Sequence, residues 1–300
     1  MNKKTNKIIA AVLVVVAIAA TVFAGCSMAK DDSAQDTSSS AGAKATGVIT
    51  VISREEGSGT RDAFTELMEI VDADGNDATA ATAEITNSTS VMMSTVKGNA
   101  QAIGYVSLGS LSDEVKALSL DGAAPSTDTV KDGSYKLQRP FNIAYIDGSL
   151  SDIAADFISY IMSKDAESII NEEGYIGIDS TETYTASHMS GTVTLAGSTS
   201  VAPLMNVLAD KYKELNPDAK IEIQESGSSA GIQSAAEGAV DIAMSSRDLK
   251  DDEAAKLKSE KIALDGIAVI VNTENAVSSI TSAQVKSIYM GEITDWDDIK

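Results

Sequence analysis

The stretch Ser53-Arg54-Glu55-Glu56-Gly57-Ser58-Gly59-Thr60-Arg61 decides the fold, because it joins two segments of different periodicity. Before it, Val48 to Ile52 form a short apolar run typical of a buried strand. After it, Thr60 to Val71 carries apolar residues at the i, i+3, i+4 and i+7 spacing of an amphipathic helix, namely Phe64, Leu67, Met68 and Val71. The stretch is therefore predicted to be a strand-to-helix junction. Its glycines permit a tight turn, and the start of the helix offers unpaired backbone N–H groups.

Two further junctions of the same kind lie far behind the first one in the chain. Ala196-Gly197-Ser198-Thr199-Ser200-Val201-Ala202-Pro203 follows a predicted strand, and Gly227-Ser228-Ser229-Ala230-Gly231 follows another. A helix start carries a partial positive charge, and Ser and Thr hydroxyls add donors. Three such junctions facing one cleft would form a pocket for a small oxyanion. The alternative for each single junction is an ordinary N-cap, because Ser and Thr commonly precede helices.

Strand-like and helix-like segments alternate along the chain. This alternation predicts the α/β class, with mostly parallel strands. Predicted strands cover 48–52, 102–106, 193–195, 221–223, 240–244 and 266–272. Predicted helices cover 60–71, 90–96, 153–162, 166–172, 203–215, 230–237 and 282–289.

The N-terminus has the pattern of a targeting segment. A lysine-rich start precedes an apolar run from Ile8 to Phe23, which is followed by Ala24-Gly25-Cys26. Small residues before a lone cysteine resemble a bacterial lipoprotein signal, although Phe23 departs from the usual Leu. We expect residues 1–25 to be the signal peptide and Cys26 to be lipidated, giving a stable two-chain anchor. The alternative is a plain signal peptide and an incidental buried Cys26. Residues 26–46 are polar and are expected to form a flexible tether.

Charge and composition exclude several functions. The formal net charge of −21 argues against nucleic-acid binding, which needs basic patches. It does not argue against an anionic ligand, because oriented backbone N–H groups bind anions locally in acidic proteins. Cys26 is the only cysteine and His188 the only histidine, so an internal disulfide, a zinc site and Cys–His catalysis are unsupported. We expect no metal and no cofactor.

From Gly47 to Lys300 the chain resembles the substrate-binding proteins of phosphate ABC transporters. The resemblance rests on the three junctions and on the stretches 102–105, 139–141, 174–176, 241–247, 265–272 and 291–296. It implies a phosphate contact by Arg54, with Glu56 as the acidic residue that holds this arginine. The further contacts that it implies are made by Ser58, Gly59, Thr60, Thr199, Ser200 and Ser228.

One position departs from the family pattern. Some members have an aspartate after the strand that matches 240–244, where it accepts the proton of hydrogen phosphate and rejects sulfate. Here the aligned residue is Ser246, whose hydroxyl either donates or accepts, so the choice of anion stays open. Arg247 either adds charge to the pocket or pairs with nearby acids. Arg54 has an alternative too, as a solvated ion pair with its neighbouring glutamates.

The order of the two motifs is the reverse of the family's usual order. The resemblance therefore implies a circularly permuted, two-lobed periplasmic-binding-protein fold of the type II-like kind, with the ligand cleft between the lobes. One lobe is expected to be continuous, from 146 to 266. The other is expected to combine 47–145 with 267–300, with hinges near Tyr145 and Ile267. The polar segment Ser180 to Gly191 would join the usual termini.

The function that this resemblance implies is a lipid-anchored receptor on the extracytoplasmic face of a bacterial cell membrane. It would bind inorganic phosphate as a monomer and deliver it to the transmembrane subunits of an ABC permease. We do not expect an enzyme, since Ser58 and Ser200, the possible nucleophiles, lack a plausible base. The alternatives are a receptor for another oxyanion, a surface sensor or adhesin on the same fold, and a chain that needs a partner chain to complete each lobe.

Overall fold

The computed structural model of the protein describes residues 46–299. The predictions for the signal peptide, for lipidation of Cys26 and for nearly all of the tether lie outside these residues. In the described part of the chain, no helix is both long and apolar enough to cross a membrane.

Buried apolar residues divide the described chain into two lobes, each built around a large core, and the second lobe has a further small cluster. In the first core, the ring of Phe64 stacks on Tyr105 at 4.0 Å and meets the edge of Tyr289 at 4.8 Å. In the second core, the rings of Phe157 and Tyr212 lie 4.9 Å apart. We call the lobe around the first core (49–137 and 267–299) the first lobe, and the lobe around the second core (141–263) the second lobe.

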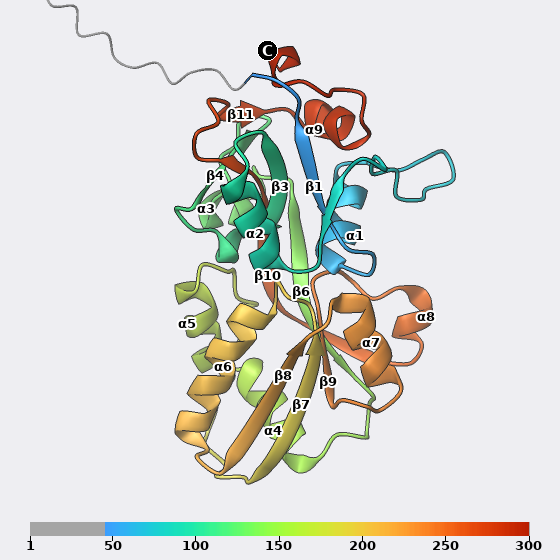
Figure 1. Cartoon of the computed structure of the whole chain (residues 1–300). Helices are drawn as coiled ribbons and strands as arrows, with labels where there is room; N and C mark the ends of the chain where they lie inside the picture. The colour runs from blue at the N-terminus through green and yellow to red at the C-terminus, as the bar shows by residue number, and fades with distance from the viewer. Residues whose placement is uncertain (1–45, 300) are drawn as a thin grey trace, which may run out of the picture. The chain divides into compact units, whose positions relative to one another are not determined.

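The elements of the first lobe come from both ends of the described chain (Figure 1). They are β1 (Thr50–Arg54), α1 (Gly59–Leu67), β2 (Glu84–Thr86), α2 (Thr89–Gly98), β3 (Ala102–Ser107), β4 (Val115–Ala117), β5 (Ser119–Leu120), α3 (Thr127–Lys131), β11 (Ser279–Ile280) and α9 (Ser282–Tyr289). Two short 3-10 turns, Leu108–Ser110 and Trp296–Asp298, complete this lobe.

In the second lobe, two helices follow the first strand, and strands and helices then alternate one by one. Its elements are β6 (Gln138–Tyr145), α4 (Asp152–Ile161), α5 (Lys164–Glu172), β7 (Gly191–Gly197), α6 (Ala202–Leu215), β8 (Ala219–Glu225), α7 (Ser228–Ala236), β9 (Ile242–Ser245) and α8 (Asp251–Ala254). The last strand, β10 (Lys258–Asn272), leaves this lobe and enters the first one.

The main sheet has the strand order β2-β1-β3-β10-β6-β9-β7-β8, with β4 added to β10. β1 pairs in parallel with β2 and β3, and β7 pairs in parallel with β8 and β9. All pairs of β10 with β3, β4 and β6, and the pair of β6 with β9, are antiparallel. The prediction of mostly parallel strands is therefore wrong for the two crossing strands. Because β6 carries the chain into the second lobe and β10 carries it back, the two run in opposite directions.

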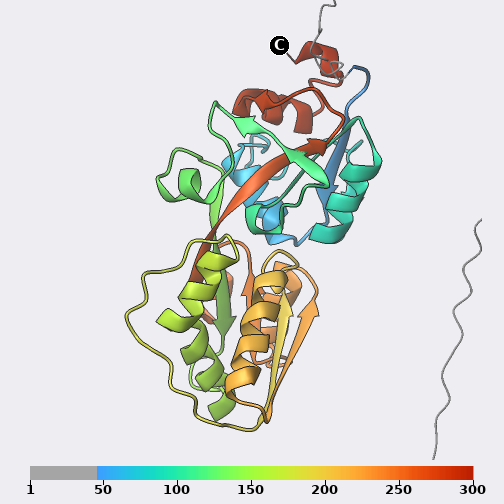
Figure 2. The ribbon, with the colours of Figure 1, turned by 90° about the vertical axis from the view of Figure 1, so that its left-hand side faces the viewer.

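Strand β10 is the structural link between the lobes. Its residues 258–266 pair with β6, and its residues 267–271 pair with β3. Figures 1 and 2 show this strand passing from the second lobe into the first. The chain crosses between the lobes a second time on β6. This crossing does not lie at the predicted hinge near Tyr145, because Phe141 and Tyr145 already pack into the second core. The residues between them pair with β9, so the crossing on β6 lies near Leu137, the last residue of the first core on this side.

Helix α1 ends four residues before the predicted Val71. Glu69 has a left-handed backbone, with φ of 54°, which stops the helix. The N–H of Ile70 then turns back to donate to the carbonyl of Thr65 at 2.8 Å. An apolar residue at position 71 fits the helical period, but the spacing carries no signal for this local turn.

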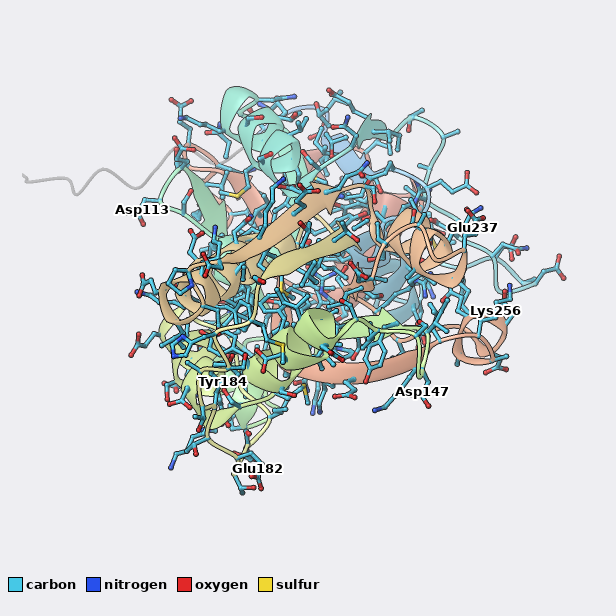
Figure 3. The ribbon with its side chains drawn as sticks, turned by 90° about the horizontal axis from the view of Figure 1, so that it is seen from below. Asp113, Asp147, Glu182, Tyr184, Glu237 and Lys256 are labelled. Atoms are coloured by element: carbon cyan, nitrogen blue, oxygen red, sulfur yellow. The ribbon has the colours of Figure 1, made fainter. Side chains whose placement is uncertain are left out.

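The connecting segment, residues 177–190, has no regular secondary structure, yet it is fastened to the second lobe. Its anchor is Asp156 on α4, whose Oδ2 accepts hydrogen bonds from Tyr184 Oη at 2.6 Å and from Ser187 Oγ at 2.8 Å. Tyr212 of α6 donates to the same oxygen at 2.6 Å. In Figure 3 Tyr184 and Glu182 mark this segment, and Glu182 is exposed.

Candidate functional site

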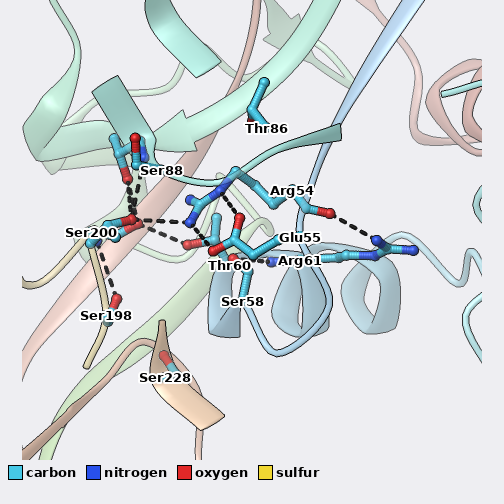
Figure 4. A network of polar contacts seen from close by, with 12 residues as sticks. Arg54, Glu55, Ser58, Thr60, Arg61, Thr86, Ser88, Ser198, Ser200 and Ser228 are labelled. Atoms are coloured by element: carbon cyan, nitrogen blue, oxygen red, sulfur yellow. Dashed lines mark hydrogen bonds and ion pairs between the residues drawn. The ribbon is translucent and has the colours of Figure 1, made fainter. Parts of the chain in front are cut away.

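Arg54, the last residue of β1, is buried between the lobes with 2% of its surface exposed. Its Nε and Nη2 each donate to one carboxylate oxygen of Glu55 at 2.7 Å, and Nη2 also donates to Thr199 Oγ1 at 3.0 Å (Figure 4). No hydrogen bond within residues 46–299 uses Nη1. The guanidinium is therefore held as a planar fork, with one nitrogen left for a ligand.

The acid that holds Arg54 is Glu55, not the predicted Glu56. The carboxylate of Glu55 reaches both donors on one edge of the guanidinium. Glu56 is exposed in the turn that follows. The alternative of a solvated Arg54 is wrong as well, because the arginine side chain is buried.

Hydroxyl groups from both lobes meet beside Arg54. Thr60 Oγ1 lies 2.8 Å from Ser200 Oγ, so the start of α1 touches the loop before α6. Thr89 is the first residue of α2. Its Oγ1 lies 3.2 Å from Thr199 Oγ1 and 3.1 Å from Ser200 Oγ. Its backbone N–H also donates to Thr199 Oγ1 at 3.2 Å. All four residues are buried.

Sequence reasoning missed Thr89. The signal was present, because Ser88-Thr89-Ser90 precedes a predicted helix in the same way as the three chosen junctions. Without a glycine in this stretch, it resembles an ordinary N-cap, and Ser88 does cap α2 by accepting from the N–H of Val91. The side chain of Thr89 is the part that faces the site.

The third junction closes the site from the second lobe. Ser228, at the start of α7, accepts a hydrogen bond from the N–H of Ser246 at 3.2 Å, and the two Oγ atoms lie 3.4 Å apart. Gly227 before it has φ of 85°, a conformation that favours glycine. Between the lobes, the N–H of Ser229 donates to the carbonyl of Gly57 at 3.1 Å.

Arg247 lies next to the hydroxyl cluster but faces acids. Its Nε donates to Asp62 at 2.9 Å, and its two terminal nitrogens donate to both oxygens of Glu253 at 2.7 and 2.9 Å. The remaining donors go to Ser229 Oγ and to the carbonyl of Asp248. An arginine has five N–H donors. All five donors of Arg247 are used here. Arg247 therefore pairs with nearby acids, as one of its two alternatives predicted, and has no donor left for a ligand.

A second buried arginine lies beneath the site, where the crossing strands meet. Arg139 on β6 donates through Nε and Nη2 to one oxygen of Asp265 on β10 at 3.2 Å. Ser107 donates to the other oxygen at 2.9 Å, and Arg139 Nη1 donates to the carbonyl of Ser246 at 3.3 Å. Burial raises the pKa of Asp265 to about 6, although Arg139 and Ser107 act to lower it. In the sequence, 139–141 is only part of a resemblance, and no local pattern assigns a role to the pair of Arg139 and Asp265.

The cluster is rich in hydrogen-bond donors for a small anion. Helices α1, α2, α6 and α7 all begin at it, and the N–H groups of Gly59 and Thr60 take part in no hydrogen bond within the described residues. His188 lies in the exposed connecting segment, so among residues 46–299 no histidine is near these hydroxyls. No group of acids, histidines or cysteines suited to a metal occurs among the described residues. One cation, free N–H groups and seven hydroxyls remain, which fit a small oxyanion. The hydroxyls belong to Ser58, Thr60, Thr89, Thr199, Ser200, Ser228 and Ser246.

Comparison with known proteins agrees with this architecture. A family model described as PBP superfamily domain matches residues 12–165 and 182–300. The phosphate-binding protein PstS 2 of Streptococcus pneumoniae is 49% identical over 260 residues, which are 85% of this chain and 89% of that protein. The crystal structure of a phosphate ABC transporter phosphate-binding protein from Streptococcus pneumoniae TIGR4 matches with a TM-score of 0.68, covering 85% of this chain and 100% of that one at 49% identity. PstS of Bacillus subtilis is 35% identical over only 113 residues, 37% of this chain and 38% of that protein.

Two α/β lobes that hold a polar site between them define a solute-binding protein. The chain belongs to the PBP superfamily, in the family that includes the streptococcal phosphate-binding proteins. This is a family of solute-binding receptors rather than of enzymes.

Proposed function

We propose that this chain is a phosphate receptor for an ABC importer. The observation that carries the proposal is Arg54, a buried cation held by Glu55 with its Nη1 unused by the described residues, at the point where hydroxyls from both lobes converge. Related proteins of high identity and nearly full coverage are named phosphate-binding proteins. The buried cation and the hydroxyls suit a small oxyanion, and the names of these relatives specify phosphate.

The residues divide into two groups that would close on the anion. The first lobe supplies Arg54 Nη1, the hydroxyls of Ser58 and Thr60, and the free N–H groups of Gly59 and Thr60. The second lobe supplies the hydroxyls of Thr199, Ser200, Ser228 and Ser246. Hydroxyls that now meet one another can rotate to donate to phosphate oxygens instead. Thr89 joins this set as a contact of the first lobe.

The second candidate ligand is another tetrahedral oxyanion such as sulfate. The observation that favours it is Ser246, which is buried beside Ser228. A carboxylate at this position would require a protonated anion, whereas the hydroxyl of Ser246 does not. The carboxylate that contacts Arg54 belongs to Glu55, and Arg54 occupies both of its oxygens. Phosphate remains the first choice because of the names of the close relatives.

The cellular setting forms part of the proposal. A lipidated Cys26 would anchor the receptor to the outer side of a bacterial cell membrane, with 26–46 as the tether. The receptor would act as a monomer and dock on the transmembrane subunits of its permease. Mass spectrometry of Cys26 and light scattering of the detergent-solubilised chain test the anchor and the monomer.

We also propose that the chain is circularly permuted. Segment 47–49 lies against 294–296, since Ile49 N–H donates to Thr294 at 2.8 Å and Trp296 N–H donates to Gly47 at 3.0 Å. A short loop would therefore connect these two segments in the unpermuted order. The anchored segment 177–190 would then mark the usual termini, and the match to the Bacillus subtilis protein over about a third of each chain is consistent with this reading. A variant opened within 183–186 and joined at 47 and 299 should fold and bind as the original does.

Calorimetric titration of the full chain with phosphate, and with sulfate in parallel, tests the ligand. We expect one phosphate per chain, and a loss of affinity of about 100-fold or more in Arg54→Ala, because truncation removes a buried charge contact. Equal binding of both anions would support the second candidate. A folded chain that binds neither anion would refute the proposal.

A further inference from the structure

One ion pair joins the two lobes beside the hydroxyl cluster, and it involves none of the seven hydroxyl residues and neither crossing strand. Arg247 follows β9 in the second lobe, Asp62 lies in the first turn of α1 in the first lobe, and their Nε and Oδ2 atoms are 2.9 Å apart. The side chains are 7% and 32% exposed. The other ion pairs between described residues lie within one lobe or join the crossing strands.

The second lobe fixes the position of the Arg247 side chain before Asp62 contributes. Glu253 binds both terminal nitrogens, and Ser229 Oγ and the carbonyl of Asp248 take the remaining donors. These partners all belong to the second lobe. The Nε–H is thus aimed at the first lobe, so little side-chain entropy is lost when Asp62 meets it.

The lobes are not packed tightly beside this pair. A crevice of about 410 Å³ separates α1 from the loop 247–250, and Asp62 and Arg247 both line it. Gln138 and Pro140 of the crossing strand form another part of its wall. Since the crevice separates the lobes here, the ion pair bridges a region where apolar packing contributes little. Moving α1 away from loop 247–250 would break the pair.

We propose that Asp62 and Arg247 form an interlobe latch that raises the population of the closed state and slows the release of the ligand. The proposal rests on the function proposed above, and it assigns Arg247 as a positioning residue. The apparent affinity of a closing receptor is proportional to its closed fraction. For a partly exposed pair, we expect loss of the latch to weaken apparent affinity and to speed release by about 3- to 10-fold.

The test compares Asp62→Asn with Glu66→Gln in the full chain. Glu66 lies one turn further along α1, lines the same crevice and is exposed, and no ion pair of the described residues includes it. Both variants remove one negative charge from one helix. Stopped-flow measurement should show phosphate release from Asp62→Asn accelerated by about 3- to 10-fold, with the association rate within about twofold of wild type. Glu66→Gln should match wild type, and Asp62→Glu should recover part of the loss.

Small-angle scattering gives a readout that needs no ligand. Without phosphate, the radius of gyration of Asp62→Asn should exceed that of Glu66→Gln, and with saturating phosphate the two should coincide. Phosphate release from wild type should also accelerate with NaCl more steeply than release from Asp62→Asn, because salt screens the pair. Equal release rates and equal radii for Asp62→Asn and Glu66→Gln would overturn the latch. If wild type bound no phosphate, the proposed function would fail, while the radii of the ligand-free variants would still decide the latch.

Discussion

Gly59 of the first lobe and Ser228 of the second lobe approach so closely that Gly59 has room only for a hydrogen in place of a side chain. A Cβ atom on Gly59 would lie 2.4 Å from Ser228 Oγ and 2.9 Å from Ser246 Oγ. Gly59 is the first residue of α1, and its backbone is not in the left-handed region. The need for glycine is therefore one of space between the lobes.

Gly59→Ala should impair closure without impairing folding. Overpacking costs about 1–3 kcal/mol. If only the closed state carries this cost, the affinity for phosphate falls by about 5- to 150-fold. Thermal unfolding without phosphate should be unchanged or slightly improved, because alanine favours a helix. The control is Gly98→Ala in α2, where a Cβ would meet nothing within 4 Å. Phosphate titration that gives the same affinity for both variants would contradict this use of Gly59.

Glu55 and Glu56 are adjacent carboxylates, and the structure assigns them different roles. Glu55→Gln should weaken phosphate binding by about 3- to 10-fold, because the amide loses one acceptor and the charge assistance that orient Arg54. Glu56→Gln should stay within about twofold, since Glu56 is exposed and the described contacts of Arg54 do not include it. Calorimetry of both variants in one buffer decides the question. The reverse order of effects would restore Glu56 as the holder of the arginine.

Arg54→Lys tests whether geometry matters in addition to charge. Lysine keeps the positive charge but replaces the planar fork by a single ammonium group. The ammonium group would bind either Glu55 or the anion. It would not bind both at once, as the two edges of the Arg54 guanidinium can. We expect affinity to fall by about 10-fold or more, consistent with the loss of a charge-assisted bond. Affinity equal to that of wild type would show that only the charge is required.

The sequence predicted the strand-to-helix junctions because each is a local pattern of an apolar run, glycine with Ser or Thr, and a helical period. The contacts between lobes depend on pairing that no local pattern encodes. Thr89 therefore went unnoticed, and Glu56 was preferred to Glu55, since a one-residue difference in a turn decides which carboxylate reaches Arg54. The antiparallel course of β6 and β10 was missed for the same reason. The alternation of strand-like and helix-like segments predicts that the strands exist. Their direction depends on how the chain passes from one lobe to the other and back.

Ser246→Asp should change the choice of anion. A carboxylate placed at this buried position repels a dianion that has no proton, whereas hydrogen phosphate can donate a proton to it. Sulfate affinity should therefore fall by at least about 10-fold more than phosphate affinity. Parallel titrations of wild type and variant at pH 8 measure the ratio. An unchanged ratio of the two affinities would show that Ser246 does not face the anion.

Asp265 should make stability depend on pH. Because burial raises its pKa from 3.8 to about 6, the folded protein keeps this proton to higher pH than the unfolded chain does. The contribution of this group to stability is full below about pH 4 and is lost as pH rises through about 6, since the unfolded state binds fewer protons in that window. Asp265→Asn removes the titration, and its amide replaces the carboxyl beside Arg139 at a cost that does not vary with pH.

Urea unfolding of wild type and Asp265→Asn between pH 4 and 7 measures this contribution. The difference in unfolding free energy, wild type minus variant, should shrink as pH rises to about 6 and stay constant above it. A difference that grew with pH would mean that Arg139 and Ser107 outweigh burial and hold the carboxyl ionised. The Arg139–Asp265 pair would then be a permanent ion pair between the crossing strands, and the carbonyl of Ser246 would be held by the same fixed charge at all these pH values.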